Sequence, residues 1–124
     1  MNHIVIITAA ILGSTAIMLG AFGAHAFKKL ISDEKLASFE VGVRYQMYAA
    51  ITLLIFGFNL SFDLYSERFA FYGITAGTLL FSVSIYFLSF AQYWNKNLKF
   101  LGPVTPLGGL LMIAGWVALI IRFI

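Results

Sequence analysis

The chain has 124 residues, of which 61% are apolar and only 10% are charged, and its formal net charge is +3. A water-soluble domain carries about 25% charged residues, so this chain has too few charges to cover a surface exposed to water. It contains no cysteine, which excludes disulfide bonds, thiolate metal sites and cysteine nucleophiles. The charge is also too small and scattered for a nucleic-acid interface, so we expect no nucleic-acid partner.

Four long apolar segments are separated by charged residues. A membrane-spanning helix needs about 20 mostly apolar residues, and the charges fall at or near the segment ends. The segments lack the alternating pattern of a membrane β-barrel. The sequence therefore predicts an all-α fold in one domain, residues 1–124. It is an integral membrane bundle of four transmembrane helices, at about residues 4–27, 40–62, 68–94 and 106–123.

The first apolar segment has one feature of a cleaved signal peptide. Ala24-His25-Ala26 fits the A-x-A form of a cleavage site. A secretory signal starts with basic residues, however, whereas here Asn2 and His3 precede the apolar run and lysines follow it. We therefore favour a membrane helix.

The connections carry helix-start signals. Ser32, followed by Asp33 and Glu34, resembles an N-cap with acidic residues in the first turn. It predicts an interfacial helical turn that runs into the second helix, and the alternative is a solvated linker. Before the fourth helix, Thr105 is a predicted N-cap and Pro106 the first helical residue. The turn between the second and third helices, about residues 58–69, is polar and is predicted to lie in solvent.

Small residues recur on the faces of three predicted helices, and such faces let membrane helices approach closely. We interpret them as packing faces, with a lipid or ion crevice as the alternative. The glycines concerned are Gly20, Gly23, Gly73, Gly77, Gly108 and Gly109. One monomer needs fewer such faces, so we expect a homo-oligomer, a dimer or a trimer.

A cluster of polar residues lies where the first two helices meet the membrane edge. Glu40 and Arg44 are spaced for a helical ion pair, and Tyr45 suits the interface. Gln46 needs a hydrogen-bond partner. With His25, these residues form either a polar pocket or a set of interfacial anchors with satisfied side chains. His25 and Glu40 are too few ligands for a metal site.

The basic residues are distributed unevenly. Lys28, Lys29 and Lys35 lie in the first connection and Lys96 and Lys99 in the third, whereas the other side has only Arg68 and Arg122. The positive-inside rule then places both termini outside the cytoplasm.

The sequence contains no catalytic motif and no set of residues with complementary catalytic roles. We expect no enzymatic activity, no cofactor and no bound metal. One hypothesis is a non-enzymatic bundle that self-associates and interacts with membrane lipids or a membrane partner. The alternative is a small transporter or channel with a path past His25 and Gln46.

An ordered set of short motifs resembles the YwdK/YgdD-like family, bacterial membrane proteins of unknown function related to a small eukaryotic transmembrane protein. The motifs are residues 20–25, Phe39 with residues 44–48, residues 77–82 with Tyr86, and Gly102 with residues 105–109 and 115–116. The resemblance implies four membrane helices, a bacterial cell membrane and no assigned activity. This chain has Ala49 where the family often has histidine and Val83 where it often has glycine. Any shared proton or metal function of that histidine is thus absent here.

Overall fold

The computed structural model covers residues 1–124 and contains helices joined by turns and short connections. The elements are α1 (Asn2–His25), η1 (Phe27–Lys29), α2 (Asp33–Asn59), α3 (Tyr65–Thr78), η2 (Leu79–Val83), α4 (Ser84–Phe90), η3 (Lys99–Leu101) and α5 (Val104–Phe123). The turns η1 and η3 are 3-10 helices, whereas η2 is a π-helical turn.

Four helical stretches are long and apolar enough to cross a membrane: Asn2–His25, Asp33–Asn59, Tyr65–Phe90 and Lys99–Phe123. The third stretch joins α3, η2 and α4 without a break. The predicted all-α fold with four membrane-spanning helices is therefore confirmed.

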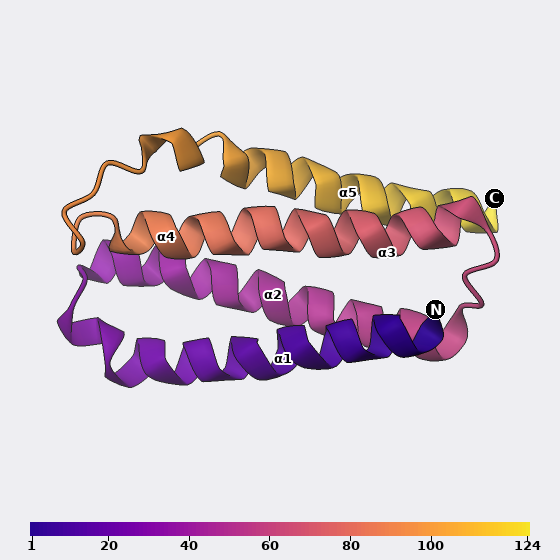
Figure 1. Ribbon diagram of the computed structural model, residues 1–124, viewed down its shortest axis with the longest axis horizontal. Helices are drawn as coiled ribbons and strands as arrows, with labels where there is room; N and C mark the ends of the chain where they lie inside the picture. The colour runs from indigo at the N-terminus through magenta and orange to yellow at the C-terminus, as the bar shows by residue number, and fades with distance from the viewer.

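The four spans run side by side and alternate in direction (Figure 1). α1 packs mainly on α2, and α5 packs mainly on α3. α2 also contacts α3, η2 and α4, so it joins the two pairs. Both termini lie at the same end of the bundle, and the two lysine-bearing connections lie at the opposite end (Figure 1).

The interior changes character along the bundle. The half nearer the termini holds a core of mostly aliphatic side chains, with Val5, Leu53 and Ile74 fully buried. The half nearer the lysine-bearing connections holds an aromatic cluster around Phe39, which is 1% exposed. Its ring centroid lies 4.9 Å from that of Tyr86 and 5.3 Å from that of Phe27. The Phe27 and Phe39 rings meet edge to face, at 84°, an arrangement that stabilises aromatic pairs beyond their buried area.

The contact between α3 and α5 is made by glycine backbones. A Cβ atom at Gly77 would lie 2.6 Å from the backbone nitrogen of Met112 and 2.7 Å from the carbonyl oxygen of Gly108. A Cβ at Gly73 would lie 3.1 Å from the Cα of Gly115. A Cβ at Gly77 would force the α5 backbone to shift, and one at Gly73 would need a smaller shift, as in other close contacts of membrane helices.

The other predicted packing glycines have more room. A Cβ at Gly20 would lie 3.5 Å from Val43, and one at Gly109 would lie 3.7 Å from the ring of Phe81, both ordinary contacts. A Cβ at Gly23 would lie a tighter 3.3 Å from the ring of Phe39. The tightest glycine of the α1–α2 pair is Gly57, where a Cβ would lie 2.5 Å from the side chain of Ile6.

All these glycines face other helices of the same chain. The expectation of a homo-oligomer depended on small-residue faces left over after the monomer had packed. The tight faces of α3 and α5 cover each other, so that argument loses its basis. The dimer or trimer stays a prediction.

The helix starts agree in part with the sequence analysis. The side chain of Ser32 caps α2 by accepting a hydrogen bond from the Lys35 backbone at 3.2 Å, so the predicted N-cap is confirmed. Helix α2 runs unbroken from Asp33, so the predicted helical turn is its first part, and its interfacial position stays a prediction. The predicted cap at Thr105 is wrong: α5 begins at Val104, and the Thr105 hydroxyl instead forms a hydrogen bond with that of Ser84 at 2.5 Å.

We predict that Gly77→Ala lowers the free energy of unfolding by about 1–3 kcal/mol, because the added methyl group meets backbone atoms of α5 that cannot move alone. Gly109→Ala is the matched control, since its methyl group would meet only ordinary contacts. Thermal unfolding in detergent measures both. Equal stability of the two variants would contradict the assignment of Gly77 to a tight backbone contact.

Candidate functional site

The side chain of Gln46 connects three spans inside the bundle. Its Nε2 donates to the Leu12 carbonyl oxygen at 2.9 Å and to the Thr15 hydroxyl at 2.7 Å. Its Oε1 accepts a hydrogen bond from the Tyr86 hydroxyl at 2.6 Å. Gln46 is 5% exposed. These bonds therefore satisfy the hydrogen-bonding groups of its amide, for which the membrane interior offers no partners. The hydrogen-bond partner expected for Gln46 is therefore formed by Leu12, Thr15 and Tyr86.

The π-helical turn lies beside this amide. Its Ser82 is buried and donates a hydrogen bond to the Gly42 carbonyl oxygen at 2.7 Å. At Gly42 a Cβ would lie 2.8 Å from the ring of Tyr86. The absent side chain of Gly42 therefore makes room for the ring whose hydroxyl reaches Gln46. π-Helical turns are rare and often occur at functional sites, but here every polar group named has a partner within the protein.

The structure does not bring the five predicted polar residues together. His25, Glu40 and Arg44 are exposed, and Tyr45 is 42% exposed. The protein has one ion pair, Glu67 with Arg122, so the predicted pair between Glu40 and Arg44 is not formed. Only Gln46 is part of a buried network.

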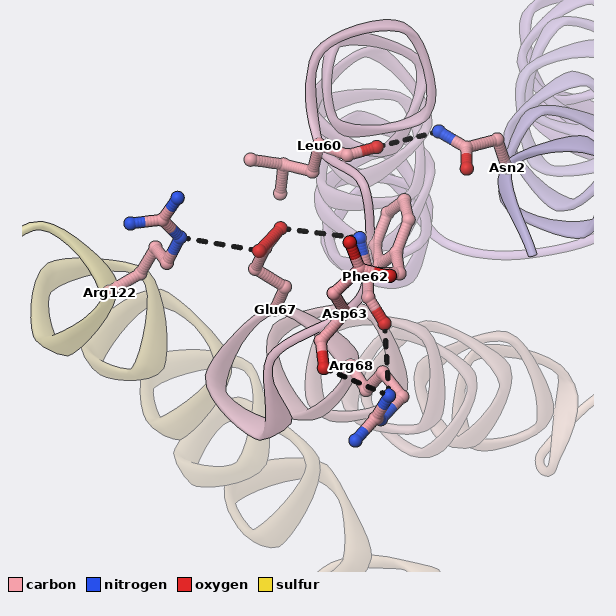
Figure 2. A network of polar contacts seen from close by, with 7 residues as sticks. All are labelled: Asn2, Leu60, Phe62, Asp63, Glu67, Arg68 and Arg122. Atoms are coloured by element: carbon pink, nitrogen blue, oxygen red, sulfur yellow. Dashed lines mark hydrogen bonds and ion pairs between the residues drawn. The ribbon is translucent and has the colours of Figure 1, made fainter.

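A second polar network lies at the end of the bundle that holds the termini, and Figure 2 shows it. Glu67 is 1% exposed, so the prediction that its segment lies in solvent is wrong for this side chain. One carboxylate oxygen accepts a hydrogen bond from the Phe62 backbone at 3.3 Å, and the other accepts one from Arg122 Nε at 3.2 Å. Glu67 therefore ties the turn between α2 and α3 to the end of α5. No local pattern marks it as buried, because Arg122 lies 55 residues further along the chain.

The same network holds an unusual backbone conformation. Phe62 has a φ of 61°, a left-handed conformation that is uncommon for a bulky residue. Its amide donates to Glu67, and its carbonyl oxygen accepts from Arg68 at 3.0 Å. Nearby, the Asn2 side chain donates to the Gly57 carbonyl oxygen at 2.9 Å. It also donates to the Leu60 carbonyl oxygen at 2.6 Å, at the end of α2 (Figure 2).

The two ends of the bundle differ in charge. The half with the lysine-bearing connections has six basic and three acidic side chains, whereas the other half has two of each, so the whole formal charge of +3 belongs to one half. The nine in the first half are Lys28, Lys29, Asp33, Glu34, Lys35, Glu40, Arg44, Lys96 and Lys99. No group of three His, Asp or Glu residues in the chain lies close enough to hold a metal ion.

We predict that Arg122→Gln lowers the free energy of unfolding by roughly 3 kcal/mol and that Glu67→Gln lowers it by roughly 1 kcal/mol. The first change leaves a carboxylate that is 1% exposed without its cation, whereas the second leaves an arginine that is already 35% exposed. Lys29→Gln, on the exposed turn η1, is the control for loss of a charge. Chemical unfolding in detergent measures the three variants. The reverse order for Glu67 and Arg122 would refute the buried-carboxylate explanation.

Comparison with known proteins gives the chain a family. Residues 19–109 match the family described as "Protein of unknown function (DUF423)". The chain is 40% identical over 116 residues to the UPF0382 membrane protein SAB0533 of Staphylococcus aureus, covering 94% of this chain and 91% of the relative. It is 39% identical over 119 residues to the UPF0382 membrane protein YwdK of Bacillus subtilis, covering 94% and 92%.

No solved structure matches the chain. The resemblance drawn from the motifs is confirmed, since YwdK is among the relatives. The matched family model covers more than half of the sequence, and the relatives cover nearly all of it. The chain therefore belongs to the DUF423 family, whose bacterial relatives are named UPF0382 membrane proteins.

Proposed function

We propose that this protein is a non-enzymatic, multi-pass protein of the bacterial cell membrane whose lysine-rich end interacts with anionic lipids of the cytoplasmic leaflet. The observation that carries the proposal is the concentration of the whole formal charge of +3 in one half of the bundle. Anionic headgroups attract basic side chains at a membrane surface by about 1 kcal/mol per residue.

The aromatic side chains beside the lysines support this proposal. Tyr93 and Trp94 follow α4, and their exposed fractions are 52% and 44%. Both residue types prefer the boundary between membrane and water, where the ring is apolar and its edge is polar. They would set the depth of this end of the bundle so that the neighbouring lysines reach the headgroups.

The orientation follows from the same charges. With the lysine-bearing connections in the cytoplasm, both termini and the turn between α2 and α3 lie outside. The second polar network then lies at the outer face, where its basic and acidic side chains balance.

A transport path past His25 and Gln46 has less support. Both amide hydrogens of Gln46 and its carbonyl oxygen are used within the protein. His25 is exposed at the end of α1 and forms no hydrogen bond with that network. A path would need these bonds to open.

The lipids that remain bound after extraction in a mild detergent test the proposal. We expect phosphatidylglycerol or cardiolipin to be enriched several-fold over zwitterionic lipid, relative to the membrane of origin, because the lysines retain anionic headgroups. Native mass spectrometry of the wild-type protein identifies the retained lipids. Retention in proportion to the membrane composition would refute the proposed lipid interaction.

The orientation has its own test. Because the chain contains no native cysteine, a thiol reagent can label only an introduced cysteine. In intact cells, a membrane-impermeant thiol reagent should label Asn2→Cys and should not label Lys96→Cys until the membrane is permeabilised. The opposite pattern would place the lysines outside and remove the basis for contact with the cytoplasmic leaflet.

A further inference from the structure

The lysine-rich end contains a polar hollow of about 580 Å³ between the start of α2 and the chain that joins α4 to α5. Three lysines line it, together with three side chains that carry an amide group and no acidic side chain. The lining polar residues are Lys35, Gln92, Asn95, Lys96, Asn97 and Lys99. Because the only ion pair of the protein lies at the other end, none of these lysines has a carboxylate partner.

The backbone that forms one wall of the hollow has a defined shape. Asn95 has a φ of 56°, and it follows the last turn of α4. The Lys96 amide donates to the Ala91 carbonyl oxygen at 2.9 Å, and the Asn95 amide donates to that of Gln92 at 3.1 Å. This pair of bonds around a left-handed residue is the Schellman motif, a regular helix C-terminus. The hollow is thus bounded by a regular helix end that turns Lys96 and Lys99 back toward α2.

Lys35 is the lysine of the hollow that belongs to an α-helix. It lies in the first turn of α2, where its own backbone amide is held by Ser32 at 3.2 Å. It also lines two smaller hollows, of about 270 and 410 Å³, so the three hollows share Lys35. Its partial burial contrasts with the exposed Lys96 and Lys99.

Unused donors converge on this space. The side-chain amides of Gln92 and Asn95 form no hydrogen bond within the protein, and that of Asn97 only accepts one, from the Lys99 backbone at 3.2 Å. Their NH₂ groups and the three lysine ammonium groups are therefore unpaired donors, and the carbonyl oxygens of the same amide groups are acceptors. A phosphate diester, with one negative charge and oxygen atoms that accept, complements the three ammonium groups and the NH₂ donors of this lining.

We propose that this hollow binds the phosphate group of an anionic phospholipid, with Lys35, Lys96 and Lys99 around the phosphate. The neighbouring Tyr93 and Trp94 place the hollow at headgroup depth, which favours a lipid over a soluble phosphate. The inference rests on the proposed function and deepens it, because it replaces a diffuse attraction by one site.

A pair of double variants tests the site. Lys96→Gln/Lys99→Gln removes two charges from the hollow. Lys28→Gln/Lys29→Gln removes two exposed charges from η1, at the same end of the bundle. Neither Lys28 nor Lys29 lines any of the three hollows. Native mass spectrometry measures the dissociation constant of added phosphatidylglycerol, with phosphatidylcholine as the zwitterionic reference. We expect about a tenfold loss of phosphatidylglycerol affinity in the hollow variant and less than about a threefold loss in the η1 variant.

The possible results separate the two proposals. Equal losses in the two double variants would overturn the site and leave the general attraction of this end for anionic lipid. No preference of the wild type for phosphatidylglycerol over phosphatidylcholine would overturn the proposed function itself. Inorganic phosphate is added to the wild type in a separate series. If it bound at the hollow while phosphatidylglycerol did not, the lipid assignment would be wrong.

Discussion

The close approach of α3 and α5 is the constraint on which the rest of the bundle depends. In a membrane, apolar side chains gain nothing by leaving lipid for another helix, so packing and polar contacts must hold the spans together. Gly73 and Gly77 on α3 and Gly108 and Gly115 on α5 bring the two backbones into direct contact. That contact fixes α5 beside α3, and it thereby places Arg122 where its side chain reaches the buried carboxylate of Glu67. The ion pair at the end of the bundle is a consequence of the glycine contact in its middle.

The two helix pairs are joined by polar contacts rather than by glycine backbones. Between α2 and the third span, Ser82 and Tyr86 donate to Gly42 and Gln46. Gln46 in turn reaches Leu12 and Thr15 on α1. Hydrogen bonds are directional, so these bonds set the rotation of α2 about its own axis relative to both neighbouring helices. Apolar contacts in lipid would leave that rotation loosely defined. The network is therefore explained by the assembly of the bundle, without assigning it a transported species.

Most of the fold could be predicted from the sequence because the features that determine the helices lie close together along the chain. Charges at the centre of a bilayer are costly, so their positions mark the ends of the four spans, and the Ser32 cap depends on neighbouring residues only. The polar sites have distant causes. Tyr86 lies 40 residues from Gln46, and Arg122 lies 55 residues from Glu67. A polar segment that ends between two helices looks like a solvated turn until the helix that covers it is known, which is why Glu67 was expected in solvent.

The same reasoning explains why the polar site predicted around His25 differs from the lysine-lined hollow of the structure. Isolated polar residues within apolar segments, such as His25 and Gln46, are informative one by one, because each is costly in a membrane. The lysines indicate orientation and contact with anionic headgroups but no common site, because along the sequence Lys35 is separated from Lys96 and Lys99 by two membrane spans. Those spans are antiparallel, so they return the chain to the same end of the bundle (Figure 1). The regular end of α4 then turns Lys96 and Lys99 toward the first turn of α2. Lysines that lie far apart along the sequence thus become neighbours around a single hollow, where the proposed site brings them to one phosphate.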